Sequence, residues 1–116
     1  MTLNELAKKI HKNAVEKGWY DPPKTILEAC MLFITEIAEA VEELRKNTPP
    51  FYYDPNERIT TAHPLRKPEG WAVELCDAVI RILDTLAAED IDIDKLVKLK
   101  MDYNATRPRR HGGKRW

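Results

Sequence analysis

A chain of 116 residues has room for one hydrophobic core, which we expect to span residues 1–116 as a single domain. With 43% hydrophobic residues but only 4 glycines, it lacks the turn-forming residues of an all-β sandwich or barrel, and a helical fold is favoured. Nineteen basic residues balance nineteen acidic ones, so the net charge gives no indication of a nucleic-acid or anionic-membrane partner.

Four amphipathic helices are predicted in chain order. Apolar residues recur at three- and four-residue steps from Thr2 to Lys17, after Pro23 to about Asn47, from Trp71 to Ala88 and from Ile91 to Tyr103. Most connections are short, so we expect an all-α protein whose helices form an antiparallel four-helix bundle. No window approaches the roughly 20 apolar residues of a membrane span, and the N-terminus has no export signal, so a cytoplasmic protein is expected.

Helix ends and core-facing residues are also predicted. Gly18 is expected to end the first helix, and Asp92 or Asp94 to cap the fourth. The longest apolar stripe lies on the second helix and consists of Ile26, Cys30, Phe33, Ile37, Val41 and Leu44. Cys30 and Cys76 lie inside apolar patterns, so we expect reduced thiols in the core rather than a disulfide.

The segment from Thr48 to Gly70 follows neither helical nor strand periodicity. It holds five of the eight prolines and three consecutive aromatic residues, Phe51 to Tyr53. Loops of this length in compact domains are usually functional or disordered, so a lid over a site and a flexible linker both remain open.

Two of the predicted helices carry pairs of acids at i, i+3 spacing. Glu36 and Glu39 lie beside the apolar stripe of the second helix, and Glu74 and Asp77 flank that of the third. Either pair alone is common on a solvated helix face, but such a face usually mixes charges, and no base occurs from Glu28 to Glu43. If the helices pack together, four carboxylates converge, and Mg²⁺ or Mn²⁺ would offset their repulsion.

Other catalytic chemistries find little support in the residues. The three histidines follow no Glu-x-x-His pattern of a di-iron bundle, no zinc-type spacing is present, and the chain has no serine nucleophile. Because Mg²⁺ prefers a few carboxylates together with phosphate oxygens, a phosphorylated substrate and metal-activated water are expected. Arg81 is expected to pair with Asp77 and Asp84, which lie four and three residues away on the same helix.

The C-terminal segment from Lys98 to Trp116 is basic, with seven bases and one acid. It is either a solvated terminus or a phosphate-binding segment, in which Gly112 and Gly113 would allow close approach of the backbone to a ligand. Trp19 and Tyr20 are either core aromatics or a platform that stacks on a nucleobase.

The runs Thr35 to Ala40 and Glu74 to Asp84 resemble the E-x-x-E and E-x-x-D signature of MazG-like nucleotide pyrophosphohydrolases, which belong to the all-α NTP pyrophosphatases. The resemblance extends to Gly18, Trp19 and the basic tail, and so covers most of the chain outside the long loop. It implies magnesium-dependent hydrolysis of a ribo- or deoxyribonucleoside triphosphate between the α- and β-phosphates, which yields a nucleoside monophosphate and pyrophosphate.

The same resemblance implies roles for individual residues. The implied metal ligands are Glu36, Glu39, Glu74 and Asp77, with Glu36 or Glu39 orienting or deprotonating the water. The implied substrate-binding residues are Lys100, Tyr103, Asn104, Arg107, Lys114 and Trp19. A homodimer or homotetramer is implied, with sites near subunit interfaces.

One departure from the compact members of that family is the 34-residue separation of Glu39 and Glu74, which places the choice of base in doubt. The alternative to an enzyme is a non-catalytic helical module that binds metal and nucleotide or another protein.

Overall fold

A computed structural model describes residues 1–116, the side chain of His111 excepted, and the chain is helical as predicted. Its helices are α1 (Leu3–Glu16), α2 (Ile26–Arg45), α3 (Trp71–Ala88), α4 (Ile93–Thr106) and α5 (Arg110–Gly113). Apart from one isolated bridge between Tyr52 and Glu69, the described residues form no strand. Of the described helices, none has the length and apolar character that crossing a membrane requires.

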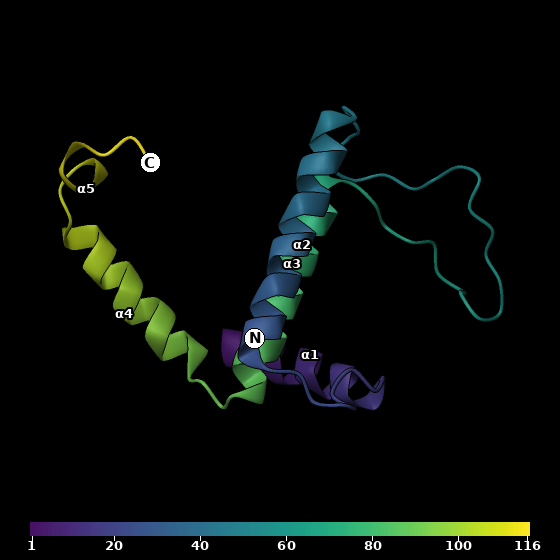
Figure 1. The fold of residues 1–116 in the computed structure, drawn as a ribbon, viewed down its shortest axis with the longest axis horizontal. Coiled ribbons are helices and arrows are strands. Elements are labelled where there is room, and N and C mark those ends of the chain that lie inside the picture. The colour runs from purple at the N-terminus through teal and green to yellow at the C-terminus, as the bar shows by residue number, and fades with distance from the viewer.

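The centre of the fold is the antiparallel pair of α2 and α3, and α1 crosses one end of this pair (Figure 1). Ala29, Ala40 and Ala78 are buried on the two long helices, where small side chains let the backbones approach closely. At the α1 end, the buried core consists of Ala7, Leu83 and Ile93, surrounded by half-buried residues. Those are Leu6, Ile10, Leu86, Ala87 and Ile91. The α2–α3 pair therefore presents two long faces, and α1 covers only part of them.

Local sequence signals explain where the helices begin and end. Thr25 forms a capping box with Glu28 at the start of α2, and the Thr2 hydroxyl accepts a backbone N–H at the start of α1. Gly18 follows α1 with a positive φ of 83°, which confirms the predicted stop. Asp92 caps α4 as one of the two predicted candidates.

The fourth helix does not complete a bundle within this chain. It packs on α1 near its first turn and then projects away from α2 and α3 (Figure 1). The Asp94 carboxylate accepts the backbone N–H groups of Leu3 and Asn4 at 3.0 and 3.2 Å, so it caps α1 rather than its own helix. The Asn4 side chain in turn accepts the Ile93 N–H at 2.7 Å and donates to Asp92 at 2.9 Å. These reciprocal caps fix the direction of α4, and the prediction of four helices around one core is wrong for this helix.

The apolar stripe predicted to be the core face of α2 is exposed in the chain. Ile26 and Leu44 are 52% and 53% exposed, and of the predicted stripe only Phe33 is half-buried. Cys30 and Cys76 are free, as predicted, but exposed, so their placement in the core was wrong. The buried face of α2 is instead the side that carries Ala29, Ala40 and Glu36.

On α2 and on α3, helical spacing places most of the exposed apolar residues on a side of the helix away from the predicted carboxylates. We call this surface the apolar flank. Its members are Leu27, Met31, Ile34, Ile37, Val41, Leu44, Leu75, Val79 and Ile82.

Candidate metal centre

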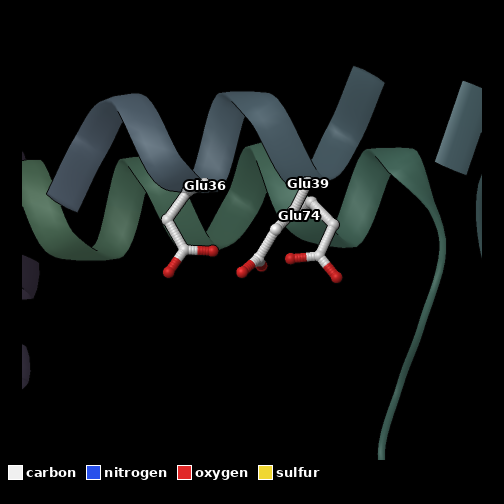
Figure 2. Close-up of side chains that lie close together, drawn as sticks. All are labelled: Glu36, Glu39 and Glu74. Carbon is white, nitrogen blue, oxygen red and sulfur yellow. The ribbon is translucent and has the colours of Figure 1, made fainter. Parts of the chain in front are cut away.

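Three carboxylates converge on the side of the α2–α3 pair opposite the apolar flank. Glu36 and Glu39 come from successive turns of α2, and Glu74 comes from the first turn of α3. One carboxylate oxygen of each lies within 4.8 Å of one from the others. Figure 2 shows all three side chains pointing to the same side of the two helices. We call Glu36, Glu39 and Glu74 the carboxylate cluster.

The fourth predicted ligand, Asp77, lies next to the carboxylate cluster but outside it. It lines a cavity together with Glu36, one turn along α3 from Glu74. Burial and the charge of Glu36 raise the pKa of Asp77, while the charges of Arg81 and Lys67 oppose the rise. Asp77 is therefore in the electrostatic field of the cluster, although its oxygens are not in the closest group.

The crowding of the cluster shows in the acidity of Glu74. Burial, a hydrogen bond with Glu39 and the charges of the neighbouring carboxylates together raise the pKa of Glu74 to about 7. At neutral pH a proton therefore relieves part of the repulsion between these groups. A divalent cation would do the same more completely, and carboxylate oxygens are the ligands that Mg²⁺ and Mn²⁺ prefer. The donor set thus fits either ion.

The sequence predicted that Arg81 pairs with acids of its own helix, and this prediction is wrong. The Nε of Arg81 donates across the helix pair to Oε1 of Glu36 at 2.6 Å. Asp84 instead contacts Nδ1 of His11 on α1 at 2.8 Å. Glu36 is only 6% exposed, so Arg81 supplies the countercharge that a buried carboxylate requires. The remaining oxygen of Glu36 is left for a ligand.

A cavity of about 230 Å³ adjoins the carboxylates. Besides Glu36 and Asp77, its walls include Asn13, Trp19 and Lys24, which come from α1 and the linker to α2. Trp19, a predicted substrate-binding residue, is 64% exposed at this site. Pockets that enclose a drug-sized ligand usually measure about 300 to 1,000 Å³, so this one holds part of such a molecule.

Asn13 and Lys24 were not predicted. No spacing in the sequence links them to the acids, because the crossing of α1 over the helix pair brings them there. A polar Asn13 between the apolar Ile10 and Ala14 was the one available signal, and it is weak.

A second, larger cavity of about 420 Å³ lies between α1 and the turn before α4. His11 lines this cavity and Asp84 lines the smaller one, so their contact joins residues of the two linings. The lining of the larger cavity has mixed charge, because it includes Lys8, Lys12 and Asp90. The carboxylate cluster is not part of its lining.

The predicted phosphate-binding residues of the C-terminal segment lie apart from the cluster. Their spacing places Lys100, Tyr103 and Asn104 on one face of α4, and Arg107 directly follows the helix as its C-cap; we call these four residues the α4 basic face. Lys100 and Arg107 lie 5.0 and 5.7 Å from the centroid of the Tyr103 ring. Lys114 follows α5 and is exposed. Because α4 projects away from α2 and α3 (Figure 1), the chain does not bring these residues to its own carboxylates.

Comparison of the chain with protein families, with characterised proteins and with solved structures finds no match. The chemistry of the site therefore has to follow from its own residues. Those residues are three clustered carboxylates with a fourth beside them, an adjoining cavity with an exposed indole, and a basic face held at a distance.

Proposed function

We propose that the protein is a magnesium-dependent nucleoside triphosphate pyrophosphohydrolase. In the proposed reaction, water attacks the α-phosphorus, the bond to the bridging oxygen of the β-phosphate breaks, and a nucleoside monophosphate and pyrophosphate leave. The observation that carries the proposal is the convergence of Glu36, Glu39 and Glu74 within 4.8 Å. The adjoining cavity and the resemblance of the two acid motifs to those of MazG-like enzymes support it.

The residues of the cluster and two of its neighbours, Asp77 and Arg81, have roles in this proposal. Glu36, Glu39, Glu74 and Asp77 hold Mg²⁺, or Mn²⁺ in its place. When bound, the cation neutralises phosphate charge and makes water more acidic. Arg81 occupies one oxygen of Glu36 and fixes its orientation, so Glu39 is the better placed of the two glutamates to accept the proton of the attacking water.

The cavity is the proposed site for the nucleoside. The exposed indole of Trp19 offers a face on which a base can stack, and the Asn13 amide can both donate and accept hydrogen bonds. Trp19 contributes to binding any base, whereas Asn13 is able to discriminate between them. Ribose and deoxyribose substrates both fit this proposal.

A homodimer or homotetramer is part of the proposal. Soluble monomers rarely expose large contiguous apolar patches, and the apolar flank follows both long helices over several turns. A second copy packed on this flank would cover it. The basic faces of the oligomer, with Lys100, Tyr103, Asn104, Arg107 and Lys114, would then bind phosphates at the cluster of a neighbouring subunit.

The test is incubation of the purified protein with a panel of ribo- and deoxyribonucleoside triphosphates, with and without Mg²⁺. We expect monophosphate and pyrophosphate as products, only when the metal is present, and no orthophosphate. Glu39→Gln should abolish turnover and leave the helical circular dichroism unchanged. Release of orthophosphate, or turnover without metal, would refute the reaction class.

A non-catalytic module that binds metal and nucleotide is the second candidate. The separation of the α4 basic face from the cluster favours it, since a single chain lacks phosphate-binding groups from α4 at the metal (Figure 1). Binding of a nucleotide with Mg²⁺ but without any product in the same panel would decide for this candidate.

A further inference from the structure

The base of the long loop, residues 48–52 and 67–72, holds its two arms together. Tyr52 and Glu69 exchange backbone hydrogen bonds of 2.9 and 3.0 Å, and the Ala72 N–H donates to the Pro50 carbonyl at 3.1 Å. Gly70 has a φ of +120°, and a Cβ there would clash with the Pro50 carbonyl oxygen. Only glycine permits this close approach of the arms.

The loop base is also bound to α2, one helical turn beyond the carboxylate cluster. The hydroxyl of Tyr52 donates to both oxygens of Glu43 at 3.2 and 3.0 Å, and the Thr48 hydroxyl donates to the same carboxylate. Glu43 follows Glu39 by four residues on the same face of the helix. It is therefore an anchor for the loop, and the arms leave the helix pair next to the site.

Lys67 lies on the arm that leads into α3. Both oxygens of Glu57, from the opposite arm, accept its backbone N–H at 3.0 Å and hold the chain at this point. Figure 2 shows that the segment that enters α3 joins it beyond Glu74 and extends away from the helix pair in the direction in which the carboxylates point. The positive charge of Lys67 acts there, since it opposes the rise in the pKa of Asp77 and contributes to the lowering of the pKa of Glu43.

The ammonium group of Lys67 remains available to a ligand. Its side chain is 74% exposed, and the paired acid, Glu69, is 4.0 Å from Nζ. Of the other cations near these acids, Lys46 also contributes to the lowering of the pKa of Glu43, and it lies at the C-terminal end of α2 rather than on the loop arm. Arg81 is bonded to Glu36 at 2.6 Å, and Lys24 lies 5.2 Å from the centroid of the Tyr20 ring in the linker after α1.

We infer that Lys67 is a substrate-binding residue that holds the phosphate chain over the carboxylate cluster. The hydrogen bonds at the base of the loop position it there. The substrate in this inference rests on the proposed function. A triphosphate brings more negative charge than one divalent cation neutralises, next to carboxylates that already repel it. A lysine on the loop arm next to the site supplies the missing positive charge as a point charge that needs no fixed geometry.

The test compares the wild-type protein with Lys67→Gln, Lys67→Arg and, as a control for the charge of the loop, Arg58→Gln. Binding of pyrophosphate at saturating Mg²⁺ is measured by calorimetry, and the KM for the best nucleotide is measured in parallel. Lys67→Gln should weaken pyrophosphate binding and raise KM about fivefold, with kcat little changed. Lys67→Arg should restore most of both, and Arg58→Gln should match the wild type.

The two proposals fail in different ways. Pyrophosphate binding that is equal in Lys67→Gln and in the wild type, or absent from the wild type, overturns the role of Lys67. Tight pyrophosphate binding that depends on Lys67, in a protein that hydrolyses no nucleotide, supports that role and refutes the proposed reaction. Because the side chain of Lys67 is exposed, neither of its two substitutions should alter the thermal unfolding temperature. That temperature therefore checks the fold of each Lys67 variant.

Discussion

Metal binding at the carboxylate cluster should compete with a proton on Glu74. The pKa of this group is raised to about 7, chiefly by burial and by Glu39. At pH 6 it is then protonated in about nine of ten molecules, and at pH 8 in about one of ten. Since the cation binds the ionised form, the apparent dissociation constant for Mg²⁺ should be about tenfold larger at pH 6 than at pH 8.

Calorimetric titration of the protein with Mg²⁺ at the two pH values measures this effect. Repeating the titration in buffers with different heats of ionisation counts the protons released. Glu74→Gln should bind the metal more weakly and with little dependence on pH, whereas Glu42→Gln, an exposed acid of α2, should behave as the wild type. Equal affinity for Mg²⁺ at both pH values, with no proton release, would refute the assignment of Glu74 as a metal ligand whose proton competes with the cation.

The same proton links stability to pH. The folded pKa of Glu74 is above its ordinary value of 4.5, so the folded chain binds the proton more tightly than the unfolded chain. The stabilisation is fully present below about pH 4.5 and is lost as the pH rises through about 7. Because the group is partly exposed, we expect the metal-free free energy of unfolding to fall by only about 1 kcal/mol over this range. Asp77 acts in the same direction, and Mg²⁺ at pH 8 should reverse the loss.

Three further predictions concern the pairing of Glu36, the apolar flank and the α4 basic face. Arg81→Met leaves the buried Glu36 without a countercharge and should lower the free energy of unfolding by about 2 to 3 kcal/mol in urea denaturation; no loss would mean that Glu36 is neutral or solvated. Val79→Asp places a charge in the apolar flank and should yield monomers in sedimentation, with a monomeric wild type contradicting the proposed oligomer. Mixing inactive Glu39→Gln and Arg107→Ala subunits should restore about a quarter of the activity if each dimeric site uses both chains, and none if each chain supplies a whole site.

The helices followed closely from local signals in the sequence. Residues Trp71–Ala88 form a helix with the predicted bounds, because apolar periodicity and the start after Gly70 agree. The last long helix was predicted to begin at Ile91 but begins at Ile93, since Asp92 caps it and Asp90 has a φ of 54° in the turn before it. Such shifts of two residues arise because periodicity does not determine which of two acids serves as the cap.

The side of α2 that faces the core could not be predicted in the same way. The stripe that contains Cys30 and Val41 is more apolar than the face that is buried, yet α3 packs on the alanine side with Glu36. A helix with an apolar stripe on one side and alanines on another has no single hydrophobic direction, and its sequence does not say which side packs on α3.

The carboxylates of the site were predictable because i, i+3 spacing fixes which side chains share a helix face. Glu36 and Glu39 lie together for this reason, and packing of α3 adds Glu74. The positions of Lys67 and Asn13 were not predictable. The position of Lys67 depends on the hydrogen bonds that hold the loop, and that of Asn13 depends on how α1 crosses the α2–α3 pair.

The carboxylate cluster and the α4 basic face lie on separate parts of this chain. In the proposed oligomer, a partner on the apolar flank leaves the carboxylate cluster accessible to the proposed substrate. The caps between Asn4 and Asp94 meanwhile direct α4 away from its own cluster. Several hydrogen bonds would have to break before α4 could fold back onto α2 and α3, whereas a neighbouring subunit can meet its basic face as it stands. For the proposed enzyme, assembly of subunits is therefore the less costly route to a site that contains both charges.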